Sequence, residues 1–253
     1  MTFNIRKIFV LFCTILTACA ADTRQLENWE ANELFTQLSE LRKEIKILKG
    51  DVKSLKQNAP TKKNTKGNKK AIEIDLSHSF PLGKSGAKYA IVEYTDYQCP
   101  YCLKHRKKTF PIIKQQYIDP GVIKYFVKDY PLDFHGQAKN AAISSQCAGQ
   151  QGKFWAMHQL IFENNRKLSK EVFSSFAGQI AINVTRFNKC LNSSEAKQIV
   201  ENNILDGELI GVQGTPAFFI GRLKDDKLVD GRALYGAQSF SAFSKVVNAL
   251  IKQ

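Results

Sequence analysis

Residues 89–102 read YAIVEYTDYQCPYC, and this stretch decides the fold of the chain. Its first seven residues form a β-rich apolar run, Asp96 begins a short turn, and the residues after Cys99 favour a helix. The unpaired N–H groups and the positive end of a helix stabilise the thiolate of a cysteine placed before it. Pro100 suits the first helical turn, where no N–H donor is needed. We therefore expect Cys99 to be the reactive thiol and Cys102 to resolve mixed disulfides formed on it.

Two other roles for this cysteine pair remain open from the residues alone. Half of a zinc site would need a second Cys-x-x-C or paired histidines, but His105 is the only histidine nearby. A purely structural disulfide is the other alternative. We expect no metal and no cofactor.

Composition and charge indicate a globular protein. The chain has 253 residues, 43% of them hydrophobic, with seven prolines, which excludes a wholly disordered or collagen-like protein. The net charge is +14, but residues 56–70 hold six lysines and no acid, and the remaining charge forms no basic stripe interleaved with aromatics. We therefore expect no nucleic-acid partner.

Residues 1–18 have the pattern of a secretory signal peptide, with two basic residues before a short apolar run. The run ends in Leu-Thr-Ala-Cys, which resembles the bacterial lipobox and implies a mature chain that begins at a lipidated Cys19. An ordinary signal cleaved at or just after Ala18 is the alternative. We expect a lipid-anchored protein of the cell envelope that faces the periplasm, with the outer membrane favoured if the source is Gram-negative.

Residues 19–56 are expected to form an oligomerisation helix. Apolar residues at 31–55 recur in alternating steps of three and four, which is a heptad pattern. A parallel coiled coil pairs Glu44 with Lys49, whereas an antiparallel one would place acid against acid. Both a parallel dimer and a parallel trimer remain open, and a helix folded back on its own domain is the alternative. The polar, basic residues 57–70 that follow are expected to form a flexible linker.

Four segments together resemble the DsbA family of bacterial thiol:disulfide oxidoreductases, in the subgroup near BdbD and ScsC. They are VEYTDYQCPYC (92–102), KDYPLDFHGQA (128–138), CAGQQGKFWAMHQLIF (147–162) and GVQGTPAFFIG (211–221). The resemblance implies an α/β protein with a thioredoxin fold over residues 71–253, interrupted by a helical insert at about 136–208.

The resemblance also implies roles for individual residues. Thr215-Pro216 matches the family's cis-proline dipeptide, which lies against the Cys-x-x-C and holds an extended substrate. Pro100 and Tyr101, between the two cysteines, are expected to contact substrate and to tune the acidity of the first one. Glu93 matches the family's buried acid, which exchanges a proton with the inner thiol, and a solvent-facing strand residue is the alternative.

Cys147 and Cys190 are expected to form a structural disulfide, as in several relatives, with two free buried cysteines as the alternative. Each lies in a separate stretch of the helical insert that favours a helix. Trp155 is expected in the core of that insert.

The direction of electron flow stays open. In an oxidase, a substrate thiolate attacks Cys99 of the enzyme disulfide; in an isomerase or reductase, reduced Cys99 attacks a substrate disulfide. The Pro-Tyr dipeptide replaces the Pro-His of the strongest DsbA oxidants, and the coiled coil resembles oligomeric isomerases, but the DsbA-like domain favours a dithiol oxidase. Expected partners are cysteine-containing exported proteins and a DsbB-like or DsbD-like membrane protein. A non-catalytic lipoprotein that binds peptides is the third alternative.

Overall fold

The computed structural model describes Gln37, which is helical and exposed, and residues 72–252. The expected signal peptide (1–18), the linker (57–70) and all of the expected coiled coil except Gln37 lie outside the described residues. Residues 72–252 belong to one compact unit. Within residues 72–252, no helix is both long and apolar enough to cross a membrane.

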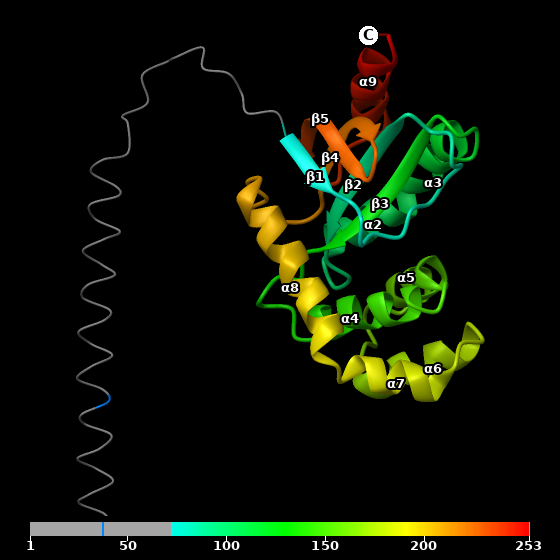
Figure 1. Ribbon diagram of the computed structural model, residues 1–253, viewed down its shortest axis with the longest axis vertical. Coiled ribbons are helices and arrows are strands. Elements are labelled where there is room, and N and C mark those ends of the chain that lie inside the picture. Colours follow the sequence, from blue (N-terminus) through cyan, green and yellow to red (C-terminus); the bar gives the residue numbers. More distant parts are fainter. Residues whose placement is uncertain (1–36, 38–71, 253) are drawn as a thin grey trace, which may run out of the picture. The chain divides into compact units, whose positions relative to one another are not determined.

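A five-stranded mixed sheet forms the centre of the domain (Figure 1). The strands are β1 (Ile72–Asp75), β2 (Tyr89–Thr95), β3 (Ile123–Asp129), β4 (Ala217–Lys224) and β5 (Lys227–Tyr235). Their order is β1-β5-β4-β2-β3, in which β2 and β3 are parallel and all other neighbours are antiparallel. Strand β2 has a strand on each side and six of its seven residues are buried, which explains its nearly continuous apolar sequence.

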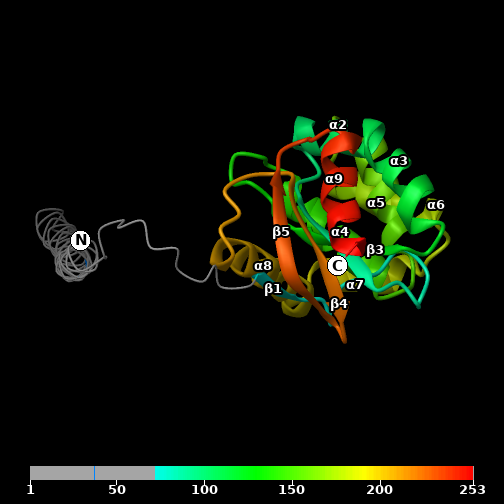
Figure 2. The ribbon, with the colours of Figure 1, turned by 90° about the horizontal axis from the view of Figure 1, so that it is seen from above.

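Helices cover one face of this sheet. They are α2 (Pro100–Lys108), α3 (Phe110–Ile113), the π-helical turn η1 (Lys114–Ile118) and α9 (Phe240–Ile251). Figure 2 shows α3 and α9 on the same side of β4 and β5. Successive residues of a strand point to opposite faces, so Ile91 packs with Phe110 and Phe243 under these helices, while Val92 and Tyr94 join a separate cluster on the other face.

Five helices are inserted between β3 and β4. They are α4 (Ala138–Gly149), α5 (Phe154–Glu163), α6 (Lys170–Gln179), α7 (Val184–Leu191) and α8 (Ser194–Leu209). The side chains of Ser169, Asn183 and Ser193 each accept a hydrogen bond from the first turn of the helix that follows, which explains where α6, α7 and α8 begin.

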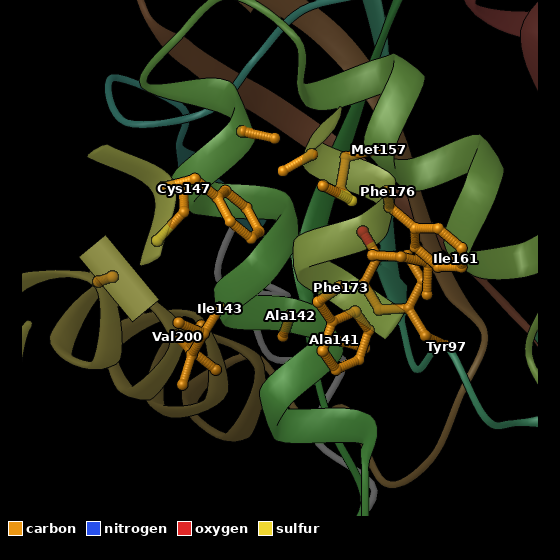
Figure 3. Close-up of a cluster of buried hydrophobic side chains, with 14 of the residues drawn as sticks. Tyr97, Ala141, Ala142, Ile143, Cys147, Met157, Ile161, Phe173, Phe176 and Val200 are labelled. Carbon is orange, nitrogen blue, oxygen red and sulfur yellow. The ribbon is translucent and has the colours of Figure 1, made fainter. Parts of the chain in front are cut away.

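The insert has its own hydrophobic core (Figure 3). Alanines on α4, including Ala141 and Ala142, allow close approach, and Phe173 and Phe176 of α6 fill the space beside them. Tyr97 and both cysteines of the Cys-x-x-C belong to the same buried cluster. The insert therefore supports the turn that carries the cysteine pair.

A disulfide joins Cys147 of α4 to Cys190 of α7, with 5.7 Å between their Cα atoms. Trp155 lies elsewhere than expected: it packs with the core of the sheet and α3, and its Nε1–H donates to the Phe80 carbonyl at 3.2 Å. The expectation that it belongs to the insert's core is wrong. Its ring lies 6.4 Å from that of Phe110 and 6.2 Å from that of Tyr125, measured between ring centroids.

Candidate active site

The two cysteines of the Cys-x-x-C motif lie where the turn after β2 enters α2. Cys99 immediately precedes the helix, with φ −68° and ψ 124°, and Pro100 begins it. Cys99 therefore adjoins the N–H groups of the first turn, which have no partner within the helix. Cys102 has no exposed surface, whereas Tyr101 is 61% exposed. Both cysteines are free thiols.

The two thiols differ in acidity. A hydrogen bond with the Cys102 side chain lowers the pKa of Cys99 to about 5, and the Thr215 side chain and the backbone N–H groups of Cys102 and Tyr101 act in the same direction against the effect of burial. Burial raises the pKa of Cys102 well above its ordinary value, helped by Cys99 and by the charge of Glu93. Near neutral pH, Cys99 is thus a thiolate beside a protonated Cys102.

The loop between α8 and β4 forms the other side of the site. The Thr215–Pro216 peptide bond is cis, and the Thr215 carbonyl oxygen lies 3.3 Å from the Cys99 sulfur. Next to this contact is a hollow of ≈ 440 Å³, lined by Gly211, Gln213, Gly214, Thr215, Pro216, Tyr235 and Gly236. Because three of its seven lining residues are glycines, which project no side chain, the hollow can receive an extended peptide beside the reactive sulfur.

Asp96 fixes the turn that presents Cys99, a role that the sequence analysis did not assign. Its Oδ1 accepts hydrogen bonds from the N–H groups of Gln98 at 2.7 Å and Cys99 at 3.1 Å. Its Oδ2 accepts one from the Leu132 N–H and pairs with His135 Nδ1, both at 2.8 Å. The fully buried carboxylate thereby ties the active-site turn to the loop between β3 and α4. Aspartate at the head of a turn is a sequence signal for such bonds, although not for the contacts with the distant loop.

Glu93 is buried, with 3% of its surface exposed. Its Oε2 accepts a hydrogen bond from the Tyr125 hydroxyl at 2.7 Å, and its Oε1 accepts one from Thr95 Oγ1 at 3.0 Å. Burial raises the pKa of Glu93 to about 7, while Tyr125, Thr95 and the Arg106 charge oppose that rise. A carboxyl group that titrates near neutral pH, and whose charge acts on Cys102, can exchange a proton with that thiol.

Most of the residues expected at the site come together. They are Glu93, Cys99, Pro100, Tyr101, Cys102, Thr215 and Pro216. Cys147 and Cys190 lie in the helical insert, and Cys19 is outside the described residues. Within the described part of the chain, no group of three or more His, Cys, Asp or Glu side chains could hold a metal ion.

Comparison with known proteins relates this domain to two kinds of relative. The chain is 28% identical over 179 residues to the Na⁺/H⁺ antiporter NhaA 1 of Salinispora arenicola. The aligned segment covers 70% of this chain and 26% of the antiporter. It is 26% identical over 186 residues to a Rickettsia typhi protein named as a protein-disulfide oxidoreductase. This aligned segment covers 71% of this chain and 66% of that protein. The chain thus spans about a quarter of the antiporter's length.

Solved structures share the fold. The crystal structure of α-DsbA1 from Wolbachia pipientis matches with a TM-score of 0.62 at 23% identity, covering 71% of this chain and 94% of that one. Oxidised BdbD from Bacillus subtilis matches with a TM-score of 0.60 at 21% identity, covering 72% of this chain and 99% of that one. The expected thioredoxin fold and the resemblance to DsbA-like proteins are confirmed. A family model described as Thioredoxin matches residues 76–249, which are most of the chain, and the protein therefore belongs to the thioredoxin family.

Proposed function

We propose that this protein is an exported thiol:disulfide oxidoreductase that exchanges disulfides with folding, cysteine-containing proteins. The observation that carries the proposal is the contrast between Cys99, with a pKa lowered to about 5, and Cys102, with a pKa raised well above its ordinary value. One sulfur is prepared to attack or leave as a thiolate, and the other holds its proton. The Rickettsia typhi relative named as a protein-disulfide oxidoreductase supports the same chemistry.

In the oxidase direction, a substrate thiolate attacks the Cys99 sulfur of the enzyme disulfide. The bond to Cys102 breaks, and Cys102 leaves with the electron pair and takes up a proton. A second substrate thiolate then attacks the substrate sulfur of the mixed disulfide and releases the Cys99 thiolate. The substrate loses two electrons, which the enzyme gains. Cys99 is a good leaving group because its pKa is low.

The substrate would lie along Thr215 and Pro216, with the neighbouring hollow taking the residue beside its cysteine. Pro100 and Tyr101, both exposed next to Cys99, would contact the same segment. A DsbB-like membrane protein would reoxidise the enzyme. The Cys99 pKa of about 5 lies between the values of about 3.5 for DsbA, a strong oxidant, and about 7 for thioredoxin, a reductant, so the oxidase direction rests on the DsbA-like fold of the domain.

Equilibration of the full chain in glutathione buffers tests the proposal. An oxidase should have a reduction potential well above the thioredoxin value of about −270 mV. A value near that of thioredoxin would contradict the oxidase direction, and no exchange at all would contradict the proposal as a whole. In matched controls, Cys99→Ser should abolish exchange, whereas Cys102→Ser should still form a mixed disulfide.

An oligomeric isomerase or reductase, with a DsbD-like partner, is the second candidate. It rests on the heptad pattern of residues 31–55 and on Pro-Tyr between the cysteines. Reactivation of a substrate with scrambled disulfides, without external oxidant, would favour it. In either case we propose a lipid anchor on Cys19 and a place in the cell envelope facing the periplasm, at the outer membrane if the source is Gram-negative.

A further inference from the structure

A single hydroxyl group lies beside both the buried carboxyl group and the inner thiol. Glu93 and Thr95 are two residues apart on β2 and therefore point to the same face of the strand. Thr95 Oγ1 donates to Glu93 Oε1 at 3.0 Å, and the N–H of the next residue, Asp96, donates to Cys102 Sγ at 3.5 Å, which places the sulfur beside Thr95. The Thr95 side chain acts to lower the pKa of Cys102. Thr95 is 1% exposed and Cys102 fully buried, so bulk water has little access to either group.

We propose that the Thr95 hydroxyl carries the proton between Cys102 and Glu93. When Cys102 must become a nucleophile, its Sγ–H proton passes to Thr95 Oγ1 while the Thr95 proton passes to Glu93 Oε1. The products are a Cys102 thiolate, a neutral Glu93 carboxyl group and an unchanged threonine. When Cys102 is the leaving group, the same two transfers run in reverse. The proposal rests on the thiol–disulfide exchange proposed above and names a further catalytic residue for it.

Two buried side chains position Glu93 for this transfer. The Tyr125 hydroxyl donates to Glu93 Oε2, so its oxygen is free to accept a hydrogen bond from His105 Nε2 at 3.0 Å. This arrangement requires the tautomer of His105 that carries its proton on Nε2, and Nδ1 is correspondingly buried without a partner in the described residues. Burial lowers the pKa of His105 to about 3, which keeps the ring neutral near neutral pH. With Oε2 held by Tyr125, Oε1 is the oxygen that faces Thr95.

The groups around the carboxyl group come from three elements. Thr95 belongs to β2, Tyr125 to β3, and Arg106 and both active-site cysteines belong to α2 or adjoin it. Tyr125, Thr95 and Arg106 favour the carboxylate, while the Cys99 charge disfavours it. The carboxylate can thus form near neutral pH and act as the base.

The test separates the two chemical steps that occur when the reduced full chain reacts with oxidised glutathione. Cys99 first forms a mixed disulfide, and Cys102 then displaces glutathione to close the enzyme disulfide. Samples quenched in acid at successive times are weighed by mass spectrometry, which distinguishes the reduced, glutathionylated and disulfide forms. Thr95→Val removes the hydroxyl group and keeps the β-branched shape, while Thr95→Ser keeps the hydroxyl group.

We expect Thr95→Val to slow the second step by about tenfold or more at every pH and to leave the first step nearly unchanged. The rate of the second step in Thr95→Ser should stay within about threefold of the wild-type rate. The rates of the second step are compared at alkaline pH, where they no longer change with pH. Thr95→Val also removes a hydrogen bond that lowers the pKa of Glu93, but a shift of that pKa alone would not change the rate in this range. A wild-type plateau rate for Thr95→Val would overturn the proposal.

Tyr125→Phe provides an independent measurement. It removes the hydrogen bond that lowers the pKa of Glu93, so the pH midpoint of the second step should move upward by about one unit, with the plateau rate retained. An unmoved midpoint would contradict the role of Glu93 as the base. If the wild type forms no mixed disulfide, the proposed function fails; if it does and only the Thr95 variants behave as wild type, this inference alone fails.

Discussion

Replacing Cys102 with alanine removes the side chain that contributes most to the low pKa of Cys99. A hydrogen bond to a charged group contributes about 1.5 to 3 kcal/mol, and one pKa unit corresponds to about 1.4 kcal/mol. Because S–H is a weak donor, the lower end of this range applies, and the pKa of Cys99 should rise by about one unit, from about 5 to about 6. At pH 6 the thiolate fraction should then fall from roughly nine tenths to about half.

The assay is the pH dependence of alkylation of Cys99 in the reduced protein, with labelled peptides identified by mass. Cys102→Ser is the matched control, because its hydroxyl group can still donate to the thiolate and should keep the pKa near that of the wild type. Equal shifts in the alanine and serine variants would refute the assignment of the effect to this hydrogen bond. An unchanged midpoint in Cys102→Ala would refute the dominance of Cys102.

Four further predictions concern stability, anchoring and assembly. Because the pKa of Cys99 is lower in the folded protein, this group stabilises the reduced protein; its contribution is complete above the unfolded-state pKa of about 8.5 and should be lost as the pH falls through about 5. Urea unfolding of the reduced form at several pH values measures this, and the oxidised form, which also contains Glu93, is the control. Replacing Cys147 and Cys190 with alanine should lower the unfolding free energy by up to about 4 kcal/mol, because their bridge spans 43 residues, and unchanged urea midpoints would contradict this. Cys19→Ser should move the protein to the soluble fraction, and a correctly processed variant that stays with membranes would argue against the lipid anchor. A chain that begins at Ala71 should sediment as a monomer and keep its thiol exchange, whereas continued oligomerisation would remove the role proposed for the coiled coil.

Local patterns in the sequence predicted the elements that carry the cysteines. The apolar run before Asp96 forms β2, and Pro100 begins α2, because a buried strand and a helix start each leave a signal in consecutive residues. The edge strand β1 and its neighbour β5 were not predicted, since all but one residue of each strand is exposed or half-buried and charged residues interrupt their apolar ones. Their pairing with the sheet depends on partners distant in the chain.

The sequence by itself determined that a thiol pair stands at a helix start, since the Cys-x-x-C motif and the apolar run before it suffice for that. The thioredoxin fold was implied by the resemblance of four separate segments to the DsbA family. Only the tertiary structure decided what surrounds the pair. Thr215 reaches Cys99 across 116 residues, and Tyr125 reaches Glu93 across 32. These contacts and the burial that accompanies them set the acidity of each group, because desolvation and hydrogen bonding act through space and leave no periodic trace along the chain.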